Sequence, residues 1–188
     1  MITYRITKYN PAKRNEHGHY LDKTEWTAIS DIGKTEYNDV TYEAYEQIES
    51  AYIDAIKLMM QDNNLDCLII DSFEFHGSKE GFKNYEKTGR LRNILVDFDK
   101  EIGNLKNGLK LNFSEIEKII RLTLRETMWM LLLNENFEVK FGFDYYMYVK
   151  AFNIKPTTIQ LIEKAGLFVE AEIEPINYTF TEKEGNEI

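Results

Sequence analysis

Hydrophobic positions recur along this chain with the spacings that distinguish helices from strands. Residues 2 to 8 alternate between apolar and polar side chains, which predicts a first strand. From Thr41, a residue that can cap a helix, apolar residues follow at three- and four-residue intervals as far as Asn63, which predicts a long amphipathic helix. Residues 65 to 73 form a largely apolar run with consecutive isoleucines, which is typical of a buried strand.

Two capping-box sequences predict shorter helices in the second half of the chain. In a capping box, a hydroxyl and an acid or amide three residues later each bond a free backbone amide at the start of a helix. Residues 114 to 117 have this pattern and precede a stripe of apolar residues, so we expect a helix to begin there. Residues 157 to 160 repeat the pattern after Pro156, and Gly166 can end the helix that follows.

Runs of β-forming residues lie on either side of the second of these helices. Residues 128 to 133, 137 to 141 and 145 to 152 are separated by short turn sequences and predict an antiparallel meander. Residues 167 to 173 alternate in polarity and predict a last strand. These elements indicate an α+β fold, with a mainly antiparallel sheet and helices packed on one of its faces.

The composition is that of one globular domain. The chain has 188 residues, of which 43% are hydrophobic, and no linker or low-complexity segment divides it. We therefore predict a single domain over residues 1 to 180 and a charged, flexible tail at residues 181 to 188. Cys67 cannot form an internal disulfide and lies in an apolar run, so we expect a buried thiol and a cytoplasmic setting. We expect no membrane association, because the start of the chain lacks a signal-peptide pattern and no apolar stretch is long enough to span a bilayer.

Acidic charge is concentrated in one segment. Residues 35 to 78 contain ten acidic residues and a single basic residue, Lys57, so this quarter of the chain accounts for the net charge of −9. Such a charge disfavours nucleic acid as a partner and is compatible with a docking surface for a basic protein. The alternative is that these acids only keep the protein soluble. The acidic surface that we expect to contact a partner consists of Glu36, Asp39, Glu43, Glu46, Glu49 and Asp54.

Two further groups are candidate partner contacts. In the last strand apolar and acidic residues alternate. Val169, Ala171 and Ile173 should therefore point inward, and the glutamates that follow each of them should point outward. If helices cover only one face of the sheet, one row of tyrosines is exposed; the alternative is that both rows are covered. The candidates are Glu170, Glu172, Glu174, Tyr146 and Tyr148.

The sequence assigns no catalytic residue, metal or cofactor. His17 and His19 could project to the same side of an extended segment, but zinc sites use three or four ligands and no second His or Cys pair completes a set. Cys67 lies in an apolar strand, where burial disfavours the reactive thiolate. The glycines form neither a phosphate-binding loop nor a dinucleotide-binding motif.

Two stretches resemble a group of small, uncharacterised bacterial proteins. The matching residues are Tyr4-Arg5-Ile6, Lys8-Tyr9-Asn10-Pro11, Gly18, Tyr20, Glu25-Trp26-Thr27, Ser30-Asp31-Ile32-Gly33 and Phe141 to Tyr148. The resemblance implies no activity, cofactor or catalytic residue. In size and charge the chain is also similar to toxin-immunity proteins.

We therefore expect a non-enzymatic protein that binds a basic toxin or effector and neutralises it by steric occlusion. One alternative is a small enzyme with a pocket formed by Trp26, Asp31 and His17 or His19. Another is a regulatory or structural subunit. A deep pocket with converging polar groups would favour the enzyme, whereas a flat acidic face with protruding aromatic side chains would favour the binding protein.

Overall fold

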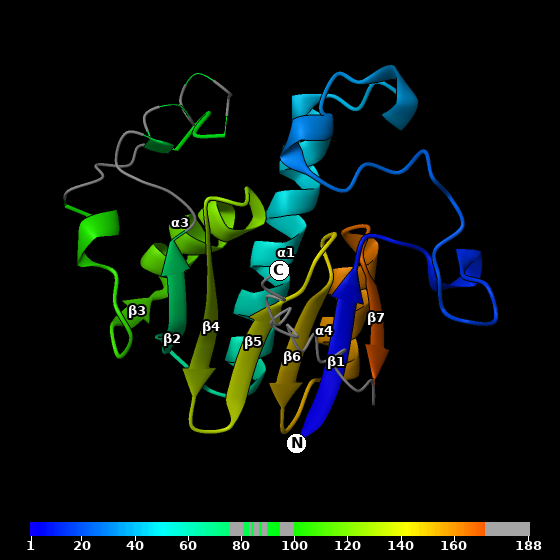
Figure 1. The fold of residues 1–188 in the computed structure, drawn as a ribbon. Helices are drawn as coiled ribbons and strands as arrows, with labels where there is room; N and C mark the ends of the chain where they lie inside the picture. Colours follow the sequence, from blue (N-terminus) through cyan, green and yellow to red (C-terminus); the bar gives the residue numbers. More distant parts are fainter. Residues whose placement is uncertain (76–80, 83, 85–86, 88–89, 95–99, 172–188) are drawn as a thin grey trace, which may run out of the picture.

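The computed structural model describes residues 1–75, 81–82, 84, 87, 90–94 and 100–171. Within these residues, one antiparallel sheet has the strand order β3-β2-β4-β5-β6-β1-β7, and helices pack behind it in the view of Figure 1. The strands are β1 (Ile2–Thr7), β2 (Cys67–Phe75), β3 (Lys110–Asn112), β4 (Met128–Asn134), β5 (Phe137–Phe141), β6 (Met147–Ala151) and β7 (Phe168–Ala171). The α-helices are α1 (Tyr42–Asp62), α3 (Phe113–Leu124) and α4 (Pro156–Lys164). The predicted α+β fold with helices on one face of the sheet is confirmed.

Successive side chains of each strand point to opposite faces of the sheet, and the two faces differ in burial. Leu132, Val139 and Val149 lie side by side on β4, β5 and β6 and are fully buried beneath the helices. The neighbouring residues, including Lys140 and Tyr148, belong to the opposite face, which we call the open face. The predicted meander is therefore confirmed, with its apolar row facing the helices. Its third strand begins at Met147 rather than at residue 145, because Tyr145 belongs to the turn.

A bulge in β2 changes which side chains reach the open face. Asp71 pairs with Leu131, whereas Glu74 pairs with Trp129, so three residue steps on β2 match two on β4. Ser72, within the bulge, has a left-handed φ of 50°. Because of the extra residue, both Asp71 and Glu74 lie on the open face despite their odd spacing.

Helix α3 is capped two residues earlier than predicted. Oδ1 of Asn112 accepts hydrogen bonds from the backbone amides of Ser114 and Glu115, at 3.0 and 3.2 Å. The Glu115 carboxylate accepts one in return from the amide of Asn112, at 2.8 Å. The predicted helix is present, but the cap at Ser114 is wrong because the Asn112 side chain already satisfies these amides.

The start of α4 is stabilised by a carboxylate from another helix. The carboxylate of Asp62, at the end of α1, accepts a hydrogen bond from the Lys155 amide at 2.8 Å and lies 3.0 Å from Lys155 Nζ. Burial opposes ionisation of Asp62, but hydrogen bonds from Lys155 and Thr158 prevail and lower its pKa. Thr157, predicted to cap this helix, is exposed within the first turn, so that prediction is wrong.

The last strand is only partly as predicted. Ala171 is exposed rather than inward, because no described element covers this end of the edge strand β7. Glu172, Glu174 and the predicted tail at residues 181 to 188 lie outside the described residues. Cys67, at the start of β2, is buried and unpaired, as predicted. No helix in the described ranges combines the length and the apolar character needed to cross a bilayer.

Candidate functional site

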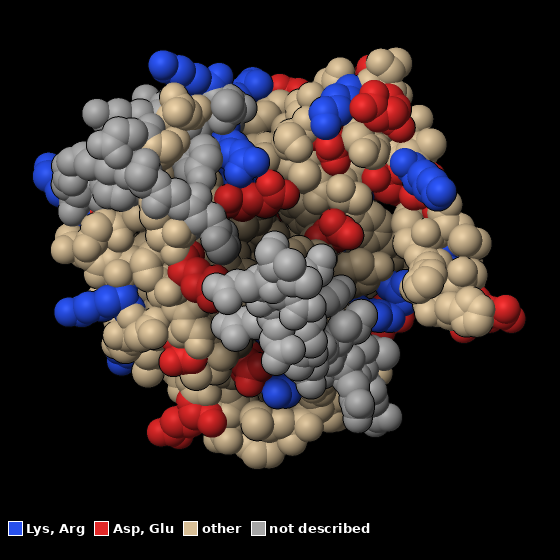
Figure 2. All heavy atoms as spheres, viewed as in Figure 1, with Lys and Arg blue, Asp and Glu red and all other residues tan. Residues whose placement is uncertain are grey.

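The open face is hollowed into a cleft of about 950 Å³. The cleft lies at the end of the sheet where β5 finishes and β4 and β6 begin, and the connection between β1 and α1 forms one wall. Figure 2 shows the hollow near the centre of this face, with acidic side chains around it. The aromatic lining consists mainly of Tyr9, Tyr20, Trp129, Phe143, Tyr146 and Tyr148. A concave site with aromatic walls and charged groups is typical of ligand-binding sites. The open face is therefore not the flat acidic face that was expected of a binding protein.

Acidic residues outnumber basic residues in the cleft. The charged lining residues are Asp22, Glu25, Glu74, Glu126, Asp144, Arg5, Lys23 and Lys140. Three of the acids form the ion pairs Asp22–Lys13, Glu25–Lys8 and Glu126–Arg90. Within the described part of the chain, Glu74 and Asp144 form neither an ion pair nor a side-chain hydrogen bond. These two carboxylates are therefore free to bind a cationic ligand.

Glu74, Trp129 and Asp144 belong to none of the sites predicted from the sequence. Glu74 and Trp129 face one another across β2 and β4 because of the bulge, which no local pattern in the sequence indicates. Asp144 lies in a turn that lacks the usual asparagine and glycine. Only the density of aromatic residues around position 145 pointed to this end of the sheet.

The turn between β5 and β6 has an unusual backbone. Asp144 and Tyr145 have φ values of 53° and 61°, both left-handed, and the amide of Tyr146 donates to the carbonyl of Phe143 at 3.1 Å. This is a type I′ turn, which normally contains Asn-Gly because a side chain is strained in this conformation. Each such residue costs on the order of 1–3 kcal/mol. The turn presents Phe143, whose exposed fraction is 58%, at the rim of the cleft.

The buried side chain of Tyr145 stabilises this turn. Its hydroxyl donates to the carbonyl of Leu124 at 2.8 Å and is hydrogen-bonded to the hydroxyl of Tyr45. The hydroxyl of Tyr52 donates to the Tyr145 carbonyl at 2.5 Å, and the Trp26 ring packs edge-on with centroids 4.9 Å apart. Burial raises the pKa of Tyr145 well above its ordinary value. The turn is thus held in place before any ligand binds.

The two tyrosines predicted to contact a partner differ in exposure. Tyr146 is half-buried beside Tyr9, with ring centroids 5.5 Å apart. Tyr148 is only 7% exposed, so the prediction that it protrudes is wrong. It lies between Lys140 and Arg5 in the cross-strand row, and long neighbours of this kind cover a central side chain. Both tyrosines line the cleft.

The predicted acidic surface is divided by the structure. Its exposed members are Glu36, Asp39, Glu43 and Asp54. Glu46 is half-buried and accepts a hydrogen bond from Asn93 at 3.1 Å. Glu49 is fully buried and bonded to Arg121 and Arg125, so the prediction that it faces water is wrong. Glu49 lies four residues after Tyr45, on the buried stripe of α1, and arginine partners make its burial possible. Helix α1 lies behind the sheet, away from the open face (Figure 1).

Glu170 finds its basic partners within the chain. Arg5 donates to both of its carboxylate oxygens at 2.8 Å, and Arg14 donates to one of them at 2.7 Å. Burial alone would raise the pKa of Glu170, but the two guanidinium groups prevail and lower it. Glu170 is therefore bonded to this protein's own arginines rather than presented freely to a partner.

The residues of the alternative enzyme pocket do not come together. Trp26 is buried, and Asp31 is buried and accepts hydrogen bonds from two backbone amides of the preceding loop. Neither lines the cleft, whereas His19 does and His17 is exposed outside it. Among the described residues, no three His, Cys, Asp or Glu side chains gather in a way that could hold a metal ion.

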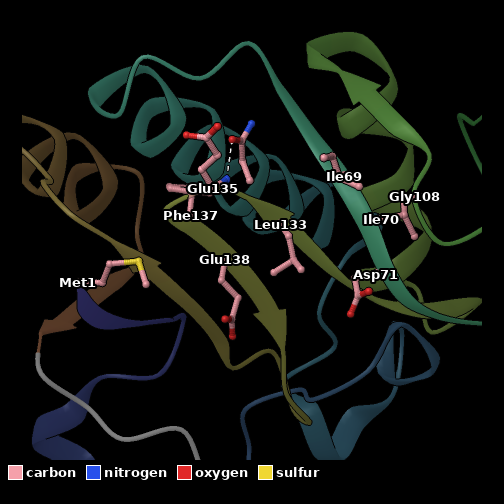
Figure 3. A pocket seen from close by; sticks show the side chains of 10 residues that line it. Met1, Ile69, Ile70, Asp71, Gly108, Leu133, Glu135, Phe137 and Glu138 are labelled. Atoms are coloured by element: carbon pink, nitrogen blue, oxygen red, sulfur yellow. Dashed lines mark hydrogen bonds between the residues drawn. The ribbon is translucent and has the colours of Figure 1, made fainter.

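A second, smaller hollow of about 410 Å³ lies further along the open face. In Figure 3, Leu133 lies between Ile69 and Glu138, and Met1 lies beyond Glu138. Its lining combines apolar residues with three acids, Asp71, Glu135 and Glu138, but has only one aromatic residue, Phe137. The Glu138 carboxylate is 3.5 Å from Lys150 Nζ. The larger cleft therefore has more groups suited to recognition.

Comparison of the chain with protein-family models, with curated proteins and with solved structures finds no match. The function is accordingly inferred from the chemistry of the larger cleft.

Proposed function

We propose that this protein is a non-enzymatic binding protein that holds a basic segment of a partner protein in the cleft. The observation that supports this most directly is the presence of two carboxylates without a cationic partner, Glu74 and Asp144, in an aromatic lining. Lysine and arginine side chains interact favourably with both kinds of group, through charge-assisted hydrogen bonds and cation–π contacts. A lysine- or arginine-containing segment is the protein ligand that suits this combination.

The molecule binds one of its own lysines with the same chemistry. Nζ of Lys8 lies 4.0 Å from the centroid of the Trp26 ring and 4.3 Å from that of Tyr9. The same atom is 2.9 Å from a carboxylate oxygen of Glu25. Aromatic rings and one carboxylate therefore suffice to hold a nearly enclosed lysine in this fold.

The charge of the whole molecule favours such a partner. The net charge is −9, and Glu36, Asp39 and Glu43 remain exposed outside the cleft. Such a field attracts a basic protein and raises the rate of association. The similarity to toxin-immunity proteins in size and charge suggests that the partner is a basic toxin or effector, which the bound protein would block by steric occlusion.

Calorimetric titration with short peptides tests this proposal. The probe is a peptide in which lysine alternates with glycine, with both ends blocked; the comparison peptide has glutamate in place of lysine. We expect only the lysine peptide to bind. Glu74→Gln and Asp144→Asn should each weaken binding about tenfold, since a hydrogen bond to a charged group contributes roughly 1.5 kcal/mol or more.

Both variants preserve the local structure. Gln is close in shape to Glu, and Asn tolerates the left-handed backbone at position 144. Glu163→Gln, exposed on α4 and outside the acidic surface, is the matched control and should leave the affinity unchanged. Equal binding of the two peptides, or undiminished lysine-peptide affinity in the Glu74→Gln, Asp144→Asn double variant, would refute the proposal.

A further inference from the structure

The guanidinium group of Arg14 is buried, and two of its three nitrogens form no hydrogen bond within the described part of the chain. Only 8% of the Arg14 side chain is exposed, and its Nη1 donates to Glu170. Its Nε and Nη2 are enclosed and have no hydrogen-bond partner among residues 1–75, 81–82, 84, 87, 90–94 and 100–171. Native proteins rarely leave buried donors unpaired, because each costs roughly 1–3 kcal/mol and a charged one costs more. We therefore expect the Nε–Nη2 edge to bind an acceptor group.

The charges around Arg14 are also unbalanced. Arg5 and Arg14 share the single carboxylate of Glu170, and Arg5 occupies both of its oxygens. Counting only residues that the structure describes, this partly buried cluster has two cations and one anion, and so a surplus positive charge. Glu170 meets Arg14 through Nη1 alone, so the Nε–Nη2 edge of Arg14 receives no bond from this carboxylate.

The geometry of the free edge indicates the kind of anion that it takes. Arg5 binds Glu170 through its own Nε and Nη2, the same two atoms that are free in Arg14. This edge presents two parallel N–H groups that match the two oxygens of a carboxylate. The cluster thus contains one such edge that binds a carboxylate, on Arg5, and an identical one on Arg14 that bonds to none of the described residues.

Arg14 adjoins the cleft through two of the cleft's lining residues. Its guanidinium carbon lies 5.8 Å from the centroid of the Tyr146 ring, and that of Arg5 lies 5.7 Å from the same centroid. The backbone of Arg14 pairs with that of Tyr20. Tyr20 and Tyr146 both line the cleft. A ligand in the cleft can therefore approach this edge if the side chains that cover it move aside.

We infer that the Nε–Nη2 edge of Arg14 is a binding site for a carboxylate group, beside the cleft. The carboxylate comes either from a free small acid or from the partner protein, as an acidic side chain or a chain end. This inference goes beyond the proposed recognition of a basic segment and does not depend on it. Because the edge is enclosed, the bound carboxylate loses its water and its charge-assisted bonds become strong.

The site can be tested by NMR on the wild-type protein. The arginine Nε–H signals are followed while acetate replaces chloride at constant ionic strength. We expect the Arg14 signal to shift and saturate, and the signals of Arg5 and Arg92 to stay nearly unchanged. Arg14→Lys keeps the charge but lacks the two-pronged edge, so acetate should raise the melting temperature of the wild type and of the matched control Arg92→Lys, but not of Arg14→Lys.

The source of the carboxylate is distinguished by a second pair of titrations. A short glycine–serine peptide with a free C-terminus is compared with the same peptide amidated. A shift of the Arg14 signal with the free peptide alone supports a chain end as the ligand, and a shift with acetate alone supports a small acid.

Three results would overturn the inference. These are an Arg14 signal that does not move with any carboxylate, one that moves equally with chloride, and one that responds to phosphate but not to acetate. The first would show that water satisfies this edge. If Arg14→Lys does not fold, the wild-type titration still decides, with Arg14 assigned through its backbone correlations. Acetate has no cationic group, and the blocked lysine peptide has no carboxylate. The Arg14 site and the recognition of a basic segment can therefore each fail without the other.

Discussion

Glu49 and Arg125 form an ion pair inside the protein: Arg125 Nε lies 2.6 Å from a Glu49 oxygen, and both side chains are fully enclosed. Nη1 of Arg125 also donates to the backbone carbonyls of Arg90 and Arg92. This single guanidinium therefore connects α1, the end of α3 and the segment at residues 90 to 92.

Removing one partner of this pair should destabilise the protein strongly. Glu49→Ala leaves Arg125 buried without its carboxylate, which costs about 3–5 kcal/mol of unfolding free energy. Urea unfolding measures the change, with the exposed Glu43→Ala as control. Replacing both residues, by Glu49→Leu with Arg125→Met, should recover much of the loss. A Glu49→Ala variant as stable as the control would contradict the assigned role of the pair.

Tyr145→Phe should loosen the turn that borders the cleft. The change removes the hydroxyl that bonds Leu124 and Tyr45, and we expect a loss of about 1–3 kcal/mol in unfolding free energy. Tyr37→Phe, in a half-buried tyrosine of the same cleft, is the control for the loss of a hydroxyl. Urea unfolding at neutral pH measures both variants, and equal stabilities would exclude a special role for Tyr145.

The same buried tyrosines predict how stability depends on alkaline pH. Burial raises the pKa of Tyr45, Tyr52 and Tyr145 in the folded protein, so they keep their protons where the unfolded chain loses them. Stability should therefore be unaffected below the ordinary tyrosine pKa of about 10 and fall as the pH rises above it. Tyr145→Phe should make this fall shallower. Unfolding curves over an alkaline pH series provide the measurement.

Asp62→Ala should weaken the packing of α4 more than a change at the predicted cap. The carboxylate of Asp62 satisfies the Lys155 amide, and loss of such a cap costs about 1–2 kcal/mol. Thr157→Ala should have little effect, because Thr157 is exposed within the first turn. The lowered pKa of Asp62 adds a second expectation. Its contribution should be complete above the ordinary aspartate pKa and be lost as the pH falls through the lowered value of the folded state. Thermal unfolding of both variants at neutral and acidic pH tests this.

The exposed acids of the predicted surface should affect the rate of binding rather than the lifetime of the complex. We expect Glu36→Lys, Glu43→Lys and Asp54→Lys together to slow association with the blocked lysine peptide, most strongly at low salt. Glu49 is left unchanged because it is buried. Glu74→Gln should instead speed dissociation, since Glu74 lines the cleft. Stopped-flow measurements over a salt series separate the two effects; equal association rates at every salt concentration would exclude steering.

The sequence by itself determined most elements of this fold and the apolar face of its sheet, although the short strand β3 was not predicted. The meander at residues 128 to 152 and the long helix after Thr41 were predictable because hydrophobic periodicity and caps are local properties of the chain. Glu49 was nevertheless predicted to face water, although it shares the buried stripe of Tyr45 and Tyr52 on α1. The hydrophobic pattern of α1 does not show that Arg125 lies beside Glu49 and stabilises the buried carboxylate.

Only the tertiary structure decided which charges are free and which are paired. Glu49 meets Arg125 across 76 positions of sequence, and Arg5 and Arg14 meet Glu170 across more than 150. Such pairs depend on how helices and strands are placed in space, and residue spacing along the chain does not encode that placement. For the same reason the cleft itself was not predictable: its unpaired carboxylates reach it through a β-bulge and a strained turn, whose conformations are held by distant side chains.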